Sequence, residues 1–287
     1  MFDTILFPVD FSKRSEKAAR WVGAYARQFH SQVIFLHLVE TPDVLFGMPE
    51  YGVVPFSQIR DEQMNERRQR LETWLAPEFA GISVRRVIAE GDPGGEIVRY
   101  AHENDVSLIM MPSHGLGPFR RFILGSTTAK VLHDAHVPVW TDAHVEENVG
   151  DAGELHKLVC AVDLGPQSAT VLQAASAIIE QTEGEAVVVH AVPMVEARPA
   201  SYFDSELAAH LSVEAHARAG ELQKQLGTNF RVCVHGGDPA DVVARAVASH
   251  KADLVVIARS AILSGLVRLR RHAYSIINKS PAPVLSV

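Results

Sequence analysis

The chain has 287 residues, of which 47% are hydrophobic and 21% charged, a composition typical of globular proteins. Its formal net charge of -7 argues against nucleic acid as the main partner, because binding to a phosphate backbone requires a basic surface. Two cysteines are too few for a disulfide framework and favour a reducing compartment.

The sequence shows neither a signal-peptide pattern before its first apolar run nor a run long enough to cross a membrane. We therefore expect a cytoplasmic protein with neither a membrane nor a nucleic acid as its partner.

In the first half, short apolar runs alternate with patterns of helical period. Strands are expected at residues 5–9, 33–39, 84–89, 108–111 and 137–141. Helices are expected on the apolar stripe at 18–29, at 57–75, after the Gly-Asp-Pro of 91–93, and at 126–134. Asp92 suits the N-cap of the third helix and Pro93 its first turn.

The second half repeats this order. Strands are expected at 158–162, 186–192, 231–235, 254–258 and 284–287, and helices at 168–179, 204–226, 239–249 and 274–279. The runs are continuous rather than alternating, as in parallel strands covered on both faces. Strand-helix alternation of this kind predicts doubly wound, Rossmann-like α/β domains.

Four sequence blocks recur in the same order in the two halves. "ILFPVDFS" matches "LVCAVDLG", "VIFLHLVE" matches "AVVVHAVP", the block at 91–113 matches 237–259, and "VPVWT" matches "APVLS". We interpret this as a tandem duplication. The expected domains are residues 1–143 and 156–287, joined by an acidic linker at 144–155.

The stretch "HGLGPFRRFILGST", His114 to Thr127, follows the fourth strand. In an open parallel sheet, ligands bind beyond the carboxyl ends of the strands. Gly115 lets the backbone approach a ligand closely, and Gly125, Ser126 and Thr127 begin a helix whose N–H groups and dipole favour phosphate. On the alternative reading, the glycines only turn the chain and Ser126 only caps a helix.

The stretch is neither a P-loop, because it lacks the lysine, nor a G-x-G-x-x-G fingerprint. Gly115, nine residues, Gly125 and Ser126 resemble the second part of the universal stress protein signature, G-x-x-G-x(9)-G-[ST]. The opening "ILFPVDFSKRSEKAARWV", the Gly-Asp-Pro helix start and the final "VPV" strand also resemble that family. The resemblance covers both halves of the chain.

This resemblance implies that each half is a five-stranded parallel sheet of order 3-2-1-4-5 flanked by helices. It also implies an adenine nucleotide, ATP or the related ADP or AMP, with Mg²⁺ alongside a triphosphate. The residues implied as its contacts are Asp10 for the ribose, Pro8, Val9 and Val39 around the base, and Gly115, Gly125, Ser126 and Thr127 around the phosphates.

The match to the signature is incomplete in both halves. Its first glycine falls at Pro112, which has no N–H to donate. In the second half Gly125 and Ser126 are replaced by about Arg270 and Arg271, so we expect no ATP site there. Two readings of the arginines there remain open: they hold another anion, or, as we expect, they are solvated surface charges. These residues are Arg259, Arg268, Arg270 and Arg271.

Two functions from different classes follow. The first is an ATP-binding regulatory protein of the stress response, with no evident catalytic base and at most slow ATPase activity. The alternative is a dimerisation or interaction module of the same fold that binds no nucleotide. Because the last strand of each half lies at a sheet edge, we expect the two halves to pair within the chain, whole chains to pair as homodimers, or both.

Overall fold

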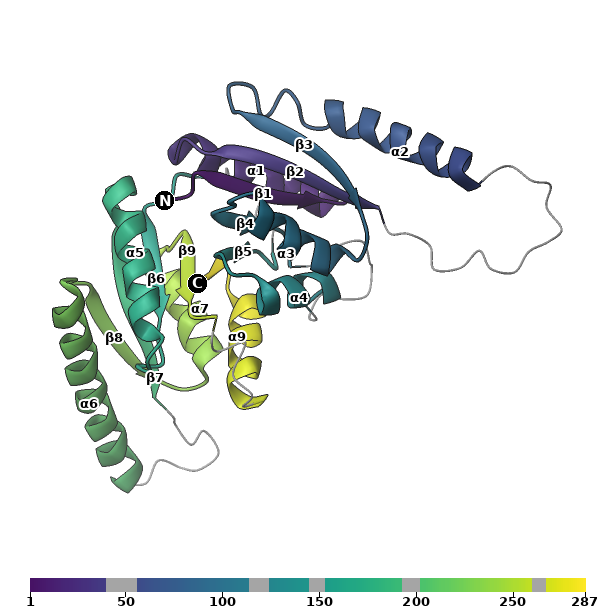
Figure 1. The fold of residues 1–287 in the computed structure, drawn as a ribbon. Coiled ribbons are helices and arrows are strands. Elements are labelled where there is room, and N and C mark those ends of the chain that lie inside the picture. The colour runs from purple at the N-terminus through teal and green to yellow at the C-terminus, as the bar shows by residue number, and fades with distance from the viewer. Residues whose placement is uncertain (40–55, 114–123, 145–152, 193–201, 260–266) are drawn as a thin grey trace.

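The computed structural model describes residues 1–39, 56–113, 124–144, 153–192, 202–259 and 267–287 (Figure 1). The elements of the N-terminal half are β1 (Thr4–Val9), α1 (Lys13–Gln28), β2 (Gln32–Val39), α2 (Phe56–Thr73), β3 (Val84–Glu90), α3 (Pro93–Glu103), β4 (Leu108–Met110), α4 (Ser126–Asp134) and β5 (Val139–Thr141). Those of the C-terminal half are β6 (Lys157–Ala161), α5 (Ser168–Thr182), β7 (Glu185–Val192), α6 (Tyr202–Leu226), β8 (Arg231–Gly236), α7 (Pro239–His250), β9 (Leu254–Ile257), α9 (Val267–Lys279) and β10 (Val284–Ser286).

The predicted strand order is confirmed in both halves. The strands form one sheet in the order β3-β2-β1-β4-β5-β10-β9-β6-β7-β8, so each half reads 3-2-1-4-5 from its outer edge. Neighbours within a half are parallel, whereas β5 and β10 run antiparallel at the centre. The two last strands therefore pair with each other, which leaves β3 and β8 at the ends of the sheet.

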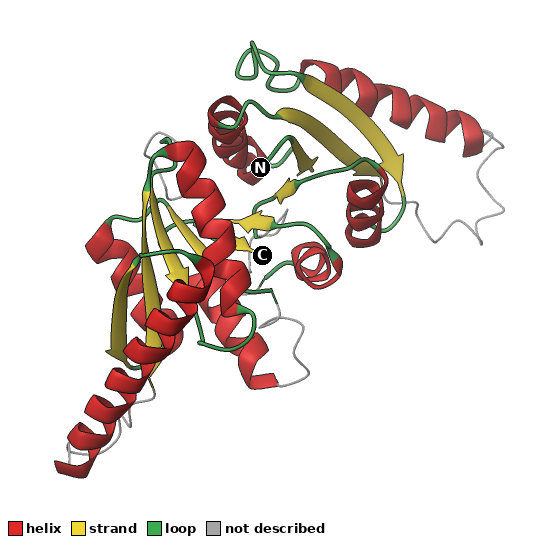
Figure 2. Ribbon diagram, turned by 60° about the vertical axis from the view of Figure 1, so that its left-hand side comes forward, coloured by secondary structure: helices red, strands yellow, loops and turns green. Residues whose placement is uncertain are grey.

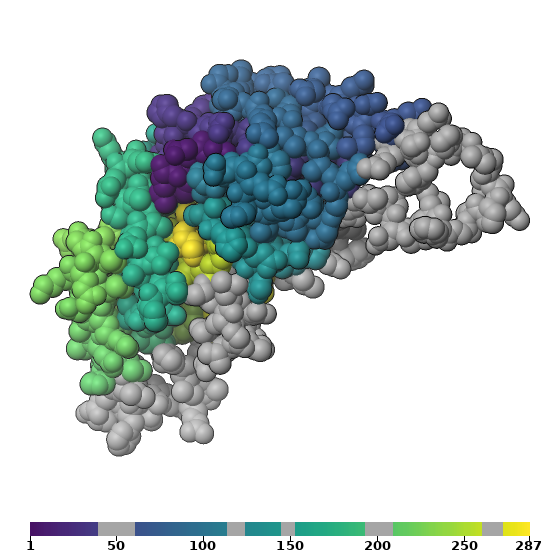
Figure 3. Space-filling view, viewed as in Figure 1, coloured from purple at the N-terminus to yellow at the C-terminus, as the bar shows by residue number. Residues whose placement is uncertain are grey.

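Helices cover both faces of this sheet (Figure 2). One core contains residues of α1, α2 and α5 with partly buried side chains of α6 packed against them, and the other contains residues of α3, α4, α7 and α9. Both cores continue from one half into the other, since buried strand residues of both halves belong to each. The chain's last residues lie between the halves in the space-filling view (Figure 3).

Arg259 is buried at the junction of the halves, so the expectation of a solvated surface charge is wrong for this residue. It is 8% exposed and donates hydrogen bonds to the backbone carbonyls of Ala135 and Val137 in the N-terminal half. A third bond reaches the carbonyl of Ser286, at 3.3 Å. Arginine suits this position because its planar group carries five donors in a fixed fork.

The local signals for helix starts act as expected. Asp92 caps α3 by accepting a hydrogen bond from the Gly95 N–H at 2.9 Å, and Pro93 lies in the first turn. The largest boundary difference is at α9, which begins at Val267 rather than at residue 274. No helix among the described residues is both long and apolar enough to cross a membrane.

Candidate functional site

The carboxyl ends of β1, β2 and β4 lie side by side in the N-terminal half. Val9 pairs with His37 near the end of β2, and β1 also pairs with β4. Asp10 directly follows β1, Val39 ends β2, and Ser113 comes three residues after β4. The strand order thus brings these sequence-predicted segments to one edge of the sheet, where open α/β folds bind ligands.

The carboxylate of Asp10 is held in a fixed orientation. Its Oδ1 accepts hydrogen bonds from the backbone N–H of Ser12, at 2.9 Å, and from the Ser15 hydroxyl, at 2.6 Å. Ser12 in turn caps α1 by accepting from the N–H of Ser15. Among the described residues, Asp10 Oδ2 has no such bond, so one carboxylate oxygen remains to accept from a ligand hydroxyl.

Ser12 and Ser15 are positioning residues that sequence reasoning missed. Asp163 repeats their arrangement, because its Oδ1 accepts from the Gly165 N–H at 2.8 Å and from the Ser168 hydroxyl at 3.1 Å. An aspartate followed five residues later by a serine, in both copies, is the signal that predicts this network.

The N-terminus of α4 is fixed to the end of β4. The N–H of Gly125 donates to the Ser113 carbonyl at 2.9 Å, and the Thr128 hydroxyl donates to the Pro112 carbonyl at 3.2 Å. The expectation that Gly125 has an unpaired N–H is therefore wrong. Among the described residues, no group accepts from the N–H of Ser126 or Thr127. The N–H groups that a ligand can use therefore begin at Ser126 rather than at Gly125.

Ser126 does not cap the helix, because Gly125 occupies the N-cap and no side chain bonds there. Ser126 is exposed and Thr127 partly exposed, which leaves two hydroxyls and two N–H groups at the positive end of the helix dipole. Gly115, Arg120 and Arg121 lie outside the described residues.

Pro112 costs the sheet no hydrogen bond. The N–H groups of Ile109, Met111 and Ser113 donate to backbone carbonyls in and beside β5. Because successive residues of a strand direct their backbone groups to opposite sides, those of residue 112 point toward β1. The pairing of β4 with β1 has already ended at Ile109. Proline therefore fits the strand end and removes one donor from this edge of the sheet, as the sequence predicts.

His37, near the end of β2, is the centre of a cluster of side chains at the ends of β1 and β2. His37 Nδ1 lies 2.7 Å from the Val9 carbonyl, and its Nε2 lies 3.2 Å from the Arg67 guanidinium. This pattern assigns the ring proton to Nδ1, with Nε2 as acceptor. Phe11 contacts the imidazole ring at 4.4 Å between centroids, and Arg70 lies over Phe11. Burial lowers the pKa of His37, and the Arg67 charge lowers it further.

Two groups at this edge of the sheet are chemically suited to contact a polar ligand. Among the described residues, one carboxylate oxygen of Asp10 at the end of β1 has no donor, and the N–H groups of Ser126 and Thr127 after the adjacent strand β4 have no acceptor. No group of three or more metal-binding side chains occurs in the described part of the chain.

The sheet topology and its repetition define a tandem, doubly wound α/β protein. The universal stress protein family model matches residues 1–141 and 154–287. The chain belongs to the universal stress protein family, with one family domain in each half.

Two of the curated relatives match half of this chain over most of their own length. A universal stress protein of Methanocaldococcus jannaschii is 30% identical over 152 residues, which cover 48% of this chain and 93% of that protein. The universal stress protein YxiE of Bacillus subtilis is 32% identical over 149 residues, which cover 48% of this chain and 97% of the length of YxiE.

The tandem arrangement also occurs in a solved structure. A universal stress protein from Archaeoglobus fulgidus superimposes with a TM-score of 0.67 at 22% identity, covering 99% of this chain and 95% of that one. This similarity supports the architecture of both halves and their connection.

Proposed function

We propose that the N-terminal domain binds an adenine nucleotide, ATP or the related ADP or AMP, and that the bound state serves a regulatory role in a stress response. The observation that carries the proposal is the N-terminus of α4, which is fixed to the end of β4 and has N–H groups without an acceptor among the described residues. The oriented carboxylate of Asp10 follows the neighbouring strand β1. A phosphate chain and a ribose need these two groups at the same edge of a sheet.

In this proposal each candidate residue has a defined part. Ser126 and Thr127 donate to the phosphates, and the free oxygen of Asp10 accepts from a ribose hydroxyl. Gly125 allows a phosphate to approach the helix without a Cβ in its path. The backbone near Pro8, Val9 and Val39 frames the base at the ends of β1 and β2. Gly115 is proposed as a further phosphate contact, and Mg²⁺ as the counterion of a triphosphate.

The proposal is for binding rather than turnover. Phosphoryl transfer needs a positioned nucleophile and charge stabilisation of the transferred group, and the sequence offers no evident base at this edge. In this proposal the signal is a change in the conformation or assembly of the chain when the nucleotide binds.

A module that binds no nucleotide is the second candidate. The observation in its favour is Pro112, which removes a donor from the strand edge that faces the ligand. Under this alternative, Gly125→Asp leaves the cellular function unchanged, because an added carboxylate then meets no phosphate.

The direct test is ligand-induced stabilisation of the full chain. A ligand that binds only the folded state at a hundred times its Kd stabilises it by about 2.7 kcal/mol. We expect ATP to raise the melting temperature by several degrees, with ADP, AMP and cyclic AMP as comparisons, and native mass spectrometry to detect copurified nucleotide. The proposal fails if no nucleotide shifts the melting temperature and none copurifies.

A further inference from the structure

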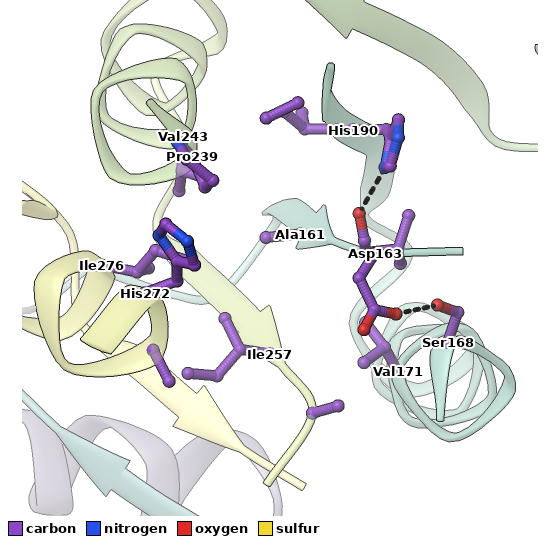
Figure 4. Close-up of a pocket in the computed structure, with 15 residues that line it drawn as sticks. Ala161, Asp163, Ser168, Val171, His190, Pro239, Val243, Ile257, His272 and Ile276 are labelled. Carbon is purple, nitrogen blue, oxygen red and sulfur yellow. Dashed lines mark hydrogen bonds between the residues drawn. The ribbon is translucent and has the colours of Figure 1, made fainter. Parts of the chain in front are cut away.

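The C-terminal half contains a pocket at the edge that corresponds to the proposed nucleotide site (Figure 4). Ala161 and Ile257 line it from the ends of β6 and β9, Val243 from α7 and Ile276 from α9. His272 lies on the α9 wall, and Asp163 lies with Ser168 at the opposite side. The pocket has no role in the function proposed above.

The size and lining of the pocket indicate the kind of group that fits. Its volume is about 160 Å³, and most of its wall is aliphatic. An apolar cavity of about 150 Å³ admits a benzene ring. A single aromatic ring is thus of the right size and polarity for the interior.

The helix start that would hold a phosphate is absent from this pocket. Asp134 and Lys279 end the matching helices α4 and α9, so Ser126 corresponds to Arg271. However, α9 begins at Val267, one turn earlier than α4 does. The N–H groups of residues 271 and 272 therefore lie inside the helix, where they bond to carbonyls four residues back.

Among the described residues that line the pocket, Asp163 is the one carboxylate, and no lysine or arginine is present. Asp163 is exposed, and its Oδ1 is already engaged by the Gly165 N–H and the Ser168 hydroxyl. Its other oxygen can accept a hydrogen bond from a ligand hydroxyl, whereas a ligand carboxylate or phosphate at the rim meets a like charge.

We propose that the pocket of the C-terminal half binds a small neutral aromatic alcohol, with the ring between α7, α9 and the strand ends and the hydroxyl at Asp163. The ligand preference is the reverse of that proposed for the N-terminal half, where the helix N-terminus favours phosphate. The two halves would then respond to different molecules, and this inference does not rest on nucleotide binding.

The test compares 2-phenylethanol with phenylacetate, which share the ring and differ in charge. NMR spectra of the full chain, labelled at valine and isoleucine methyl groups, report binding at Val243, Ile257 and Ile276. We expect 2-phenylethanol to shift these signals in a saturable manner and phenylacetate to bind about fivefold more weakly, because of the carboxylate at the rim. Equal or tighter binding of phenylacetate overturns the proposal, as does the absence of saturable shifts with the alcohol.

Two variants test separately the interior of the pocket, where the ring binds, and the carboxylate at its rim. Ala161→Leu fills the pocket and should abolish the shifts caused by 2-phenylethanol. Asp163→Asn keeps an oxygen for the hydrogen bonds at Oδ1 and removes the charge, so the difference between the two ligands should shrink. Asp10→Asn is the matched control in the other half and should leave both affinities unchanged. If Ala161→Leu binds the alcohol as the unmodified chain does, the pocket is not the site.

Discussion

Buried His37 shows how one residue can make stability depend on pH. Its ring donates from Nδ1 to the Val9 carbonyl and accepts at Nε2 from Arg67, so the neutral form is the one that the fold holds. Burial, the largest cause, lowers its pKa below the usual 6.5. The folded state therefore binds a proton less readily than the unfolded chain does.

We predict that stability is complete above the unfolded pKa and is lost as pH falls below about 6.5, since only the unfolded chain gains the proton there. Urea unfolding at about pH 7.5 and about pH 5.5 measures this loss. His37→Gln removes the titrating group and should flatten the dependence. An unchanged pH dependence in the variant would show that His37 does not cause it.

Position 184 requires glycine because the backbone of His156 leaves no space for a Cβ. A Cβ at Gly184 would lie 2.9 Å from the carbonyl carbon of His156, and the oxygen of that carbonyl accepts a hydrogen bond from the Glu185 N–H at 2.7 Å. The backbone cannot move away without losing this bond.

Gly184→Ala should therefore destabilise the chain by roughly 1–3 kcal/mol, the usual cost of overpacking. The matched control is Gly220→Ala in α6, where nothing lies within 4 Å of the added Cβ. Alanine there should stabilise by about 0.5–1 kcal/mol, because glycine is the poorer helix former. Chemical denaturation of both variants decides, and equal effects would contradict this account of Gly184.

At the scale of elements, the sequence predicts the helices and strands well wherever a local signal exists. The Gly-Asp-Pro blocks correctly place the starts of α3 and α7, because Asp92 and Asp238 both cap their helices through the side chain. The start of α9 has no such signal. Its first turn, Val267 to Arg270, alternates apolar with basic residues and has no helical apolar period, so the pattern predicts only the part from residue 274 onward.

The caps yield a prediction for the two matching helices. Asp92→Ala and Asp238→Ala should each reduce stability by about 0.5–2 kcal/mol, because each leaves helix N–H groups without an acceptor. Asp92→Asn and Asp238→Asn retain an acceptor and should cost much less. Urea titrations of the four variants check this, and equal losses for alanine and asparagine would argue that charge, not capping, matters.

At the scale of the whole molecule, pairing of β5 with β10 joins the halves, and in the described part of the chain three side chains form hydrogen bonds across the junction. Arg259 donates to carbonyls of the N-terminal half, His144 Nε2 lies 2.9 Å from the Asn278 carbonyl, and Gln28 bonds both the N–H and the carbonyl of Leu155. Pairing of whole chains remains a prediction that light scattering can test.

Arg259 was assigned wrongly from the sequence for a physical reason. A charged residue near other arginines in the sequence is expected to lie at the surface. Only the antiparallel pairing of β5 with β10 brings Arg259 close to backbone carbonyls of the other half. The alternation of strands and helices followed from patterns within one half, and the strand order followed from the resemblance to the universal stress protein family. The junction depends on contacts between halves, which no local pattern contains.

Arg259→Ala should weaken the junction, with a cost of roughly 1–3 kcal/mol for the buried carbonyls it leaves unpaired. All three tryptophans, Trp21, Trp74 and Trp140, lie in the N-terminal half, so their fluorescence reports its unfolding while circular dichroism reports both halves. We expect the two signals to separate in the variant. Arg218→Ala, at an exposed helix position, is the control. Coincident, unshifted transitions would contradict the role of Arg259.

The central claim is that one chain holds one nucleotide site, at the N-terminus of α4. Isothermal titration calorimetry with ATP tests it in the unmodified chain, Gly125→Asp and Gly125→Asn. Aspartate and asparagine are both good N-caps, so both variants should fold, but only aspartate opposes phosphate with a charge. The account predicts one ATP per chain, bound more weakly in Gly125→Asn because its side chain adds bulk in the path of the phosphate, and lost in Gly125→Asp. Two ATP per chain, or binding that persists in Gly125→Asp, would contradict it.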